Sequence, residues 1–467
     1  MKGTAESSRR VAIAGASGFV GRHLIDRLKS DHSVVALSRS ARRAQAGVEW
    51  RETDLFSASS TVQALEGCEV AIYLVHSMMP SSRLFQGSFR DTDLLLADNF
   101  AKAALATGVR HVIYLGGLVP EGALSSHLSS RREVEDVFKA TGIAVTVLRA
   151  GMIVGPGGSS FEILHSLVAR LPLMVLPAWT QSTTQAVFIE DVVDVLSRAV
   201  SELQFRDRTL DLVNGERLTY EGLLRQTADI LSVRRRMLRV PLNSTGFSKL
   251  WVSLFSNSAY ELVSPLIDSL RCDLPFSEPD PLIARSIRYH SYAAMARETL
   301  ERAPGPLSAR PSRRLKESRS VRSIQRLPVV DGHDARWITQ QYARWLPSAL
   351  RAGLRVDYDE ARERLEFRFA WLPWPLLVLQ RQLAGEGPNR DKLHIVGGVL
   401  SSTRDTGWLE FRQVQDGRFT LAAIHEFVPA LPWYVYRLTQ APIHRWVMGR
   451  FARFLEATQR SELRPAT

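Results

Sequence analysis

The sequence is poor in cysteine, has no long uncharged apolar run and carries fewer acidic than basic residues. Cys68 and Cys272 are the only cysteines among 467 residues, and neither has metal-ligand spacing around it. We therefore expect no disulfide framework, no metal site and a reducing, cytoplasmic compartment. No segment approaches the roughly 18 uncharged apolar residues of a membrane span, and no apolar signal core precedes the first expected strand. Contact with a membrane is expected to be peripheral at most.

The excess of positive charge is concentrated in one segment. The net charge is +12, and residues 301–330 alone carry eight Lys or Arg against two acids. We interpret this Pro/Ser/Arg segment as a solvated linker. The alternative is electrostatic attachment to anionic lipid or nucleic acid. No nucleic-acid-binding module or aromatic stacking pattern accompanies it, so no nucleic-acid partner is expected.

The most informative stretch is residues 11–24, VAIAGASGFVGRHL. Val11 to Ala14 predict a short buried strand, and three glycines then lead into an apolar helical pattern. Strand, glycine-rich turn and helix in this order are typical of a dinucleotide site, because free N–H groups at the helix start bind the pyrophosphate. The expected cofactor contacts are Gly15, Ala16, Ser17, Gly18, Phe19, Val20 and Gly21.

Strands and helices continue to alternate after this turn. Apolar runs at residues 34–37, 48–51, 70–75, 111–115 and 144–149 predict strands, and helical patterns separate most of them. Such alternation predicts an α/β fold with a doubly wound parallel Rossmann sheet. We place this NAD(P)-binding domain at residues 1–300, with its core at about 9–235 and a mainly helical part at about 236–300.

The pattern changes behind the basic linker, which we place at residues 301–326. A helical segment, ARWITQQYARWL, precedes alternating runs with turns at Gly407 and at Asp416-Gly417, and a long amphipathic stretch ends the chain. This order predicts an α+β domain at residues 327–460, with an antiparallel sheet and a long closing helix. Its many aromatic residues either fill a core or line a cavity for an apolar ligand.

The first three hundred residues resemble the extended and atypical short-chain dehydrogenase/reductase family, which includes proteins of the NAD-dependent epimerase/dehydratase type. The glycine spacing carries this resemblance, together with Asp54, Leu55, Leu74, Val75, His76, Arg149, Gly151, Gly155, Pro156, Phe188, Ile189, Asp191 and Val192. The resemblance implies that Asp54 and Leu55 border the adenine ring. It also implies that Leu74, Val75 and His76 line the cofactor. The region after residue 327 resembles a domain of undefined function (DUF2867-like), which we expect to be related to the helix-grip fold.

One family motif is absent. Where the family has a Tyr-x-x-x-Lys pair, this sequence has His127 and Arg131, and no tyrosine lies between Tyr114 and Tyr220. His127 could donate a proton, because imidazole titrates near neutral pH, whereas Arg131 could bind ribose or phosphate. Alternatively, the fold binds the cofactor without this chemistry. Non-catalytic members of the family do so, among them the nucleotide-binding accessory subunit of respiratory complex I.

The residues after the second strand favour NADP(H) over NAD(H). An NAD site usually places an acid there to bind the ribose 2′-hydroxyl, whereas this sequence has Ser38 and Arg39, with Arg42 and Arg43 close behind. An arginine suits a 2′-phosphate. We therefore expect an NADP(H)-binding oxidoreductase acting on a hydrophobic carbonyl, enone or quinone-like substrate. The alternative is a non-catalytic sensor or assembly protein.

Overall fold

The computed structural model describes residues 8–77, 85–120, 122, 124–241, 268–302, 320–349, 354–381, 388–402 and 407–462. Its internal contacts divide the chain into two units. The first unit comprises residues 1–79 and 96–311, and the second comprises residues 80–95 and 312–467. Most of the basic segment expected as a linker, residues 303–319, lies outside the described residues.

The first unit is built on a parallel sheet. Its seven strands are ordered β12-β7-β6-β4-β1-β2-β3, and every pair of neighbours is parallel. These strands are β1 (Arg10–Ala14), β2 (Ser33–Ser38), β3 (Val48–Glu52), β4 (Val70–Tyr73), β6 (His111–Gly117), β7 (Ala144–Ala150) and β12 (Thr209–Leu212). The expected doubly wound α/β fold is confirmed.

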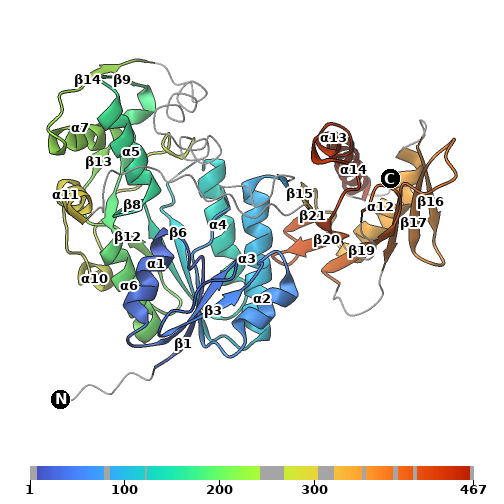
Figure 1. The fold of residues 1–467 in the computed structure, drawn as a ribbon, viewed down its shortest axis with the longest axis horizontal. Helices are drawn as coiled ribbons and strands as arrows, with labels where there is room; N and C mark the ends of the chain where they lie inside the picture. Colours follow the sequence, from blue (N-terminus) through green and yellow to red (C-terminus); the bar gives the residue numbers. More distant parts are fainter. Residues whose placement is uncertain are drawn as a thin grey trace. The chain divides into compact units, whose positions relative to one another are not determined.

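Helices cover both faces of this sheet (Figure 1). Its helices are α1 (Phe19–Leu28), α2 (Ala58–Leu65), α3 (Phe89–Ala106), α4 (Ser126–Lys139), α5 (Ser159–Arg170), α6 (Ile189–Ser201), α7 (Tyr220–Ile230), α10 (Pro281–Ala284) and α11 (Tyr292–Arg302). Helices α1 and α6 lie together on one face, and α2, α3 and α4 lie on the other. Buried Val, Ile and Leu side chains of the central strands fill the space between these layers, as expected for strands covered on both faces.

Short strands follow the main sheet and pair among themselves. They are β8 (Met152–Val154), β9 (Leu173–Leu176), β10 (Thr183–Thr184), β11 (Ala186–Phe188), β13 (Leu218–Thr219) and β14 (Arg236–Arg239). Strand β14 pairs with β9 in parallel, so the mainly helical part expected at residues 236–300 begins instead with a strand. The described helices of that part are short, and residues 242–267 lie outside the described residues.

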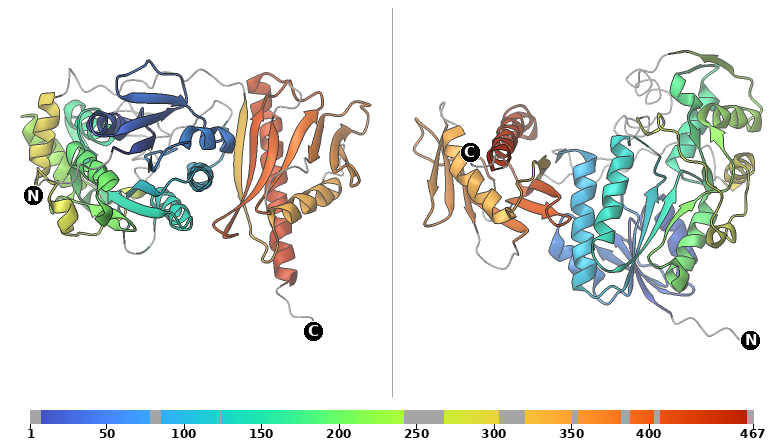
Figure 2. Two further views of the ribbon diagram at one scale, coloured as in Figure 1. Left: turned by 90° about the horizontal axis from the view of Figure 1, so that it is seen from below. Right: turned by 180° about the vertical axis from the view of Figure 1, so that it is seen from behind.

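The second unit is a sheet with helices on one face (Figure 2). Its strands pair antiparallel except for β5, which pairs with β15 in parallel. The strands run in the order β16-β17-β18-β19-β20-β21-β15-β5. Their bounds are β5 (Phe85–Gln86), β15 (Val321–Leu327), β16 (Leu354–Asp359), β17 (Arg364–Phe369), β18 (Leu377–Arg381), β19 (Arg390–Gly397), β20 (Trp408–Val414) and β21 (Phe419–Phe427). Strand β15 begins at Val321, so the sheet starts earlier than the linker boundary at residue 326 had predicted. Buried Val321, Ser323 and Ile324 fix this strand against β21.

Helices α12 (Ala335–Ala349), α13 (Trp433–Leu438) and α14 (Gln440–Glu462) complete the second unit. The expected single closing helix is broken at Thr439. Pro442 explains the break, because its ring would clash with the carbonyl of Leu438 in a continuous helix, whereas a proline is tolerated in a helix's first turn. The rest of the predicted α+β arrangement, with its long final helix, is confirmed.

Candidate functional site

The turn between β1 and α1 forms a close-packed cradle. Gly15 has a φ of +85°, and a Cβ atom there would lie 3.1 Å from the carbonyl carbon of Leu74. A Cβ on Gly21 would lie 2.4 Å from the oxygen of Gly15, so only glycine lets the helix approach the turn. Gly18 caps α1 without a side-chain hydrogen bond, and the first turn of α1 carries no acid. The helix start is therefore suited to an anionic phosphate group.

The remaining predicted cofactor residues follow the neighbouring parallel strands. Ser38 ends β2 and Arg39 follows it, exposed. Asp54 and Leu55 follow β3, and Leu74 continues β4 with its N–H bonded to the oxygen of Ala14 at 3.0 Å. The carboxyl ends of parallel strands share one edge of a sheet, so the structure brings these segments to the edge that carries the glycine turn.

Two of these residues have roles within the loops. The Oδ1 of Asp54 accepts a hydrogen bond from the N–H of Phe56 at 3.1 Å, which holds the turn after β3. The Nε of Arg42 donates to Ser38 Oγ at 3.3 Å, and its guanidinium lies 5.9 Å from the Trp50 ring. Arg42, like Arg39, therefore lies at the end of β2.

His127 and His76 are brought together from two different strand ends. The Nε2 atoms of His76 and His127 lie 2.9 Å apart. The Nδ1 of His127 lies 2.9 Å from Ser269 Oγ, and Ser269 Oγ lies 3.0 Å from Ser125 Oγ. Ser125 also caps α4 by accepting from the N–H of Leu128, which places His127 in the first turn of that helix. The four side chains form one continuous hydrogen-bonded chain.

Arg131 lies one helical turn after His127 and contacts the backbone. Its guanidinium donates to the carbonyl oxygens of Val75, at 3.2 Å, and of Leu115. It also lies 5.0 Å from the Tyr114 ring, and Tyr114 Oη donates to the oxygen of Arg131 at 3.0 Å. Arg131 is 8% exposed, so its visible role is to hold the ends of β4 and β6 together.

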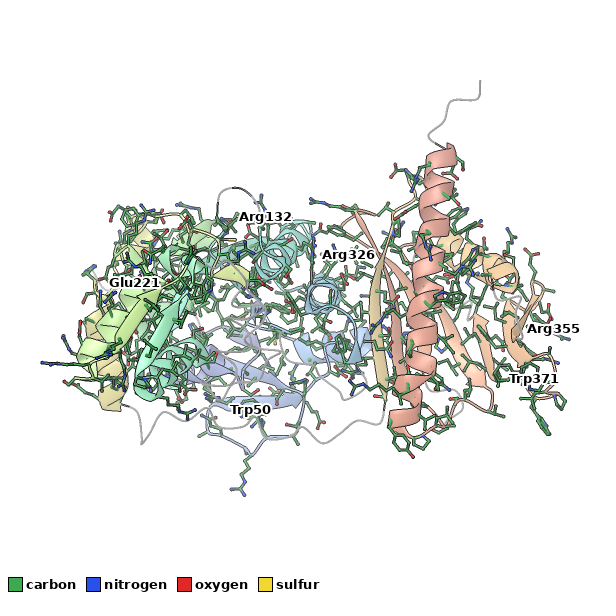
Figure 3. All side chains as sticks on the ribbon, turned by 90° about the horizontal axis from the view of Figure 1, so that it is seen from above. Trp50, Arg132, Glu221, Arg326, Arg355 and Trp371 are labelled. Carbon is green, nitrogen blue, oxygen red and sulfur yellow. The ribbon has the colours of Figure 1, made fainter. Side chains whose placement is uncertain are left out.

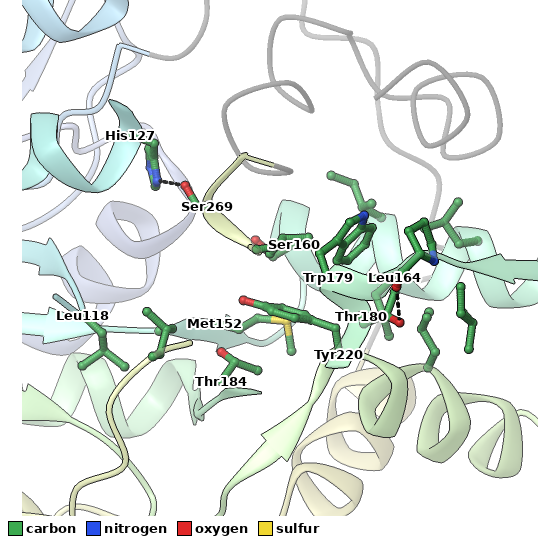
Figure 4. Close-up of a pocket in the computed structure, with 18 of the residues that line it drawn as sticks. Leu118, His127, Met152, Ser160, Leu164, Trp179, Thr180, Thr184, Tyr220 and Ser269 are labelled. Atoms are coloured by element: carbon green, nitrogen blue, oxygen red, sulfur yellow. Dashed lines mark hydrogen bonds between the residues drawn. The ribbon is translucent and has the colours of Figure 1, made fainter. Parts of the chain in front are cut away.

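An apolar cavity of about 210 Å³ adjoins His127 (Figure 4). Its walls come from the ends of β6 and β7 and from α5, β9, η1 (Ala178–Gln181) and α7. Most of the lining is aliphatic: Leu118, Leu128, Met152, Ile163, Leu164, Leu167, Met174, Val175, Leu176, Leu224, Leu270 and Leu274. A cavity of this composition suits a hydrocarbon chain or ring system better than a sugar.

A small set of polar side chains interrupts this lining. Ser269 and Tyr220 both line the cavity, and Figure 4 shows Ser269 on the cavity side of His127. Burial raises the pKa of Tyr220 to about 12, although a hydrogen bond with Thr184 opposes the shift. The phenol therefore stays protonated at neutral pH and can donate a hydrogen bond. Neither residue lies in a recognisable sequence motif, because each reaches the cavity from a distant segment.

Residues 15–166 match the protein family described as NAD(P)H-binding. The match begins at the glycine turn and ends in α5. This part of the chain is therefore an NAD(P)H-binding domain, and its fold is the expected Rossmann type.

Three curated proteins are similar to parts of the chain. Ceramide reductase of Caulobacter vibrioides is 28% identical over 239 residues, which cover 50% of this chain and 73% of that protein. Auxiliary protein GraX of Staphylococcus aureus is 29% identical over 111 residues, covering 23% of this chain and 36% of GraX. Quinone oxidoreductase 2 of Escherichia coli is 29% identical over 152 residues, covering 30% of this chain and 48% of that protein. The matches thus span less than half of the last two relatives.

Two solved structures are each similar to slightly less than two thirds of the chain. The triphenylmethane reductase of Citrobacter sp. complexed with NADP(H) has a TM-score of 0.49 at 18% identity, covering 62% of this chain and 99% of that one. A nucleoside-diphosphate-sugar epimerase from Staphylococcus aureus has a TM-score of 0.45 at 15% identity, covering 64% and 98%.

Proposed function

We propose that the chain is an NADP(H)-dependent oxidoreductase that reduces a carbonyl, enone or quinone-like group on a hydrophobic substrate. The observation that carries the proposal is the aliphatic cavity beside His127 in the NAD(P)H-binding unit. The names of two relatives, ceramide reductase and quinone oxidoreductase 2, agree with apolar substrates of this kind.

The glycine turn fits a nucleotide because the glycines let the backbone approach closely and no acid opposes a phosphate at the start of α1. Bound NADP(H) would supply the hydride. Arg39 and Arg42, at the end of β2, are the cations that would bind the 2′-phosphate. Asp54, Leu55, Leu74 and Val75 would border the cofactor along the same sheet edge.

His127 would supply the proton through Ser269. The Ser269 hydroxyl lines the cavity and lies 2.9 Å from His127 Nδ1, so it can donate to a substrate oxygen while it accepts a proton from the imidazole. His76, at 2.9 Å from the other ring nitrogen, is placed to return a proton to His127. Tyr220 would orient the substrate oxygen as a second hydrogen-bond donor. Arg131 would act as a positioning residue, through its bonds to the strand ends.

The second unit is proposed to be a helix-grip-like domain. The position of β15 beside β21, and the long α14 across the sheet, support this proposal. The space between sheet and helices is filled by Tyr342, Phe411 and Phe451, whose rings pack at 5.1–6.1 Å. This filling favours a packed core over a ligand cavity in that unit.

The substrate proposal is tested by following NADPH oxidation with alkyl ketones of increasing chain length. We expect activity to rise with chain length. Ile163→Trp should block long ketones because the indole would occupy the cavity, whereas Leu203→Trp, at an exposed position, should act like the unchanged chain. Absence of turnover with every carbonyl and quinone, alongside tight NADPH binding, would instead support the non-catalytic alternative.

The proton route is tested with His127→Phe and Ser269→Ala. General acid catalysis contributes about 10²–10⁴-fold, so His127→Phe should lower kcat by that order without changing NADPH affinity. Ser269→Ala should lower kcat less, because water can replace a hydroxyl. Unchanged kcat in His127→Phe would show that the proton comes from solvent or from His76.

A further inference from the structure

The second unit gathers exposed apolar side chains at one end of its sheet. Among the described residues, its large hydrophobic side chains that are 49–78% exposed are Trp371, Trp374, Val399, Tyr434, Leu438, Ile443 and Trp446. We call this set the tryptophan end. The comparably exposed side chains of the described part of the first unit are Leu105, Leu173, Leu203, Leu238 and Phe276, without a Trp or Tyr.

Backbone hydrogen bonds show that the loops of the tryptophan end adjoin one another. The N–H of Val399 donates to the oxygen of Pro375 at 3.1 Å, and the N–H of Leu400 donates to Leu376 at 2.9 Å. The N–H of Ala430, just before α13, donates to the oxygen of Leu400 at 2.9 Å. Loops 370–375 and 398–400 and the start of α13 therefore lie side by side. Figure 3 shows Trp371 at the end of the sheet where α14 begins.

The loop that carries the two tryptophans is held in place. Trp371 stacks on Phe369 with ring centroids 5.1 Å apart, and the N–H of Leu372 donates to the oxygen of Phe369 at 3.1 Å. Pro373 and Pro375 restrict the backbone on either side of Trp374. Trp371 and Trp374 nevertheless remain 70% and 63% exposed, which is unusual for large apolar side chains that face only water.

The helices of the tryptophan end carry positive charge, and the acids of α14, Glu456 and Glu462, lie in its second half. Residues 427–455 contain four arginines, Arg437, Arg445, Arg450 and Arg453, and no Asp or Glu. All four are exposed, and the Arg450 guanidinium lies 5.0 Å from the Trp446 ring. Ile443, Trp446 and Arg450 follow one another at helical spacing on the outer face of α14. Aromatic and aliphatic side chains mixed with arginines in this way are typical of helices that lie in a lipid interface.

We propose that the tryptophan end binds the surface of an anionic phospholipid bilayer. The tryptophans and aliphatic side chains would enter the headgroup region, where indole rings are favoured, and the arginines would contact anionic headgroups. A second copy of the chain is a poorer occupant, because a symmetric dimer would place each arginine-rich face against itself. Binding to a bilayer through these side chains does not depend on the proposed reaction.

The experiment is sedimentation of the full chain with vesicles of phosphatidylcholine alone or mixed with phosphatidylglycerol. We expect binding to the mixed vesicles, weakening as salt is added, and little binding to phosphatidylcholine alone. The double variant Trp371→Ser/Trp374→Ser should bind at least tenfold more weakly. Leu203→Ser, which removes a similarly exposed side chain of the first unit, should bind like the unchanged chain.

Folding of the double variant is checked by its NADPH affinity and thermal unfolding, which should both be unchanged. The proposal is overturned if the unchanged chain binds neither vesicle, or if the double variant binds the mixed vesicles as tightly. It is also overturned if the chain is a dimer that the double variant converts to a monomer, since the tryptophan end would then be an interface between copies.

Discussion

The two units of the chain differ in how the space beside their sheets is packed. In the first unit, aliphatic side chains surround a cavity of about 210 Å³ with a few polar groups on its wall. In the second unit, Tyr342, Phe411 and Phe451 fill the space between the sheet and α12 and α14. The cavity of the first unit is therefore the candidate ligand site among the residues that the structure describes. The exposed apolar side chains of the second unit, rather than its interior, are then its candidate functional feature.

The units also differ in how they bury polar groups. In the second unit, Glu410 is fully buried with Arg412, at 2.6 Å, and Arg390, at 2.8 Å. Burial raises the pKa of Glu410, but the charges of Arg412, His425 and Arg390 outweigh it and hold the pKa below its usual range. Two arginines thus compensate the charge of the buried carboxylate. In the first unit, His127 and Ser269 instead line a cavity.

The largest expected effect is a loss of stability when a side chain is removed from the packed interior of the second unit. Phe451→Ala removes a fully buried ring and should cost about 3–5 kcal/mol of unfolding free energy. Ile163 lies in a cavity wall, so its side chain is packed on one side only. Ile163→Ala should therefore lower the unfolding free energy by less than about 2 kcal/mol, the smallest loss usual for a fully buried aliphatic residue. Urea unfolding monitored by hydrogen exchange in each unit measures both. Equal costs would mean that the two interiors are packed alike.

The next effect is a loss of stability of the second unit at low pH. Burial lowers the pKa of His425 from 6.5 to about 4, so the folded second unit binds fewer protons than the unfolded chain between these values. Its stability is full above pH 6.5 and falls as the pH drops toward 4, by about 3 kcal/mol at 1.36 kcal/mol per pKa unit. Glu410 acts in the same direction at lower pH, because its carboxylate stays ionised in the folded state.

The pH dependence of the first unit serves as the control. Burial likewise lowers the pKa of His111 to about 4, so the first unit should also lose stability below pH 6.5. His425→Gln should lessen the pH dependence of the second unit only, as read from unit-specific hydrogen exchange. Part of it should remain, because burial also lowers the pKa of His444 to about 4. If both units changed their slopes together, their stabilities would be coupled.

A third prediction separates binding from folding in the first unit. Gly18 has an ordinary φ of −76°, and a Cβ there would have one close neighbour, the Gly15 oxygen at 3.1 Å. Gly18→Val should therefore fold, yet weaken NADPH binding at least about 100-fold, or roughly 2.7 kcal/mol, by entering the expected pyrophosphate position. Calorimetric titration measures the loss, and unchanged affinity would place the nucleotide elsewhere. Gly21 is unsuited to this test, because a side chain there would disrupt the fold itself.

Most of the correct sequence predictions came from motifs and patterns of neighbouring residues. The glycine turn is a continuous motif whose strand and helix are coded by adjacent residues. The alternation of strands and helices therefore predicted the parallel sheet. The position of His127 followed from the family resemblance, in which it takes the place of the tyrosine. Pro442 could have revealed the break between α13 and α14. Strand β18 could not be predicted from alternation, because Leu376 to Leu379 form a continuous apolar run.

Long-range contacts could not be predicted in this way. Ser269 reaches His127 across 142 residues of sequence, and Tyr220 enters the cavity from the start of α7. Neither lies in a motif, since packing of distant segments determines their position. The same holds for Arg131, whose bonds to the ends of β4 and β6 depend on tertiary contacts rather than on the residue type alone.

The smallest expected effect tests cofactor choice at the end of β2. Arg39 is exposed there, and Arg42 bonds Ser38. Removing one charge-assisted contact costs about 1.5–3 kcal/mol, so Arg39→Ala should weaken NADPH by roughly 10- to 100-fold and NADH little. Arg43→Ala, at a neighbouring exposed position, is the matched control. Fluorescence titration with both cofactors measures the ratio of affinities. Equal losses of affinity for NADPH and NADH in Arg39→Ala would show that Arg39 supports the loop. A larger loss of NADPH affinity in Arg42→Ala would assign the 2′-phosphate contact to Arg42.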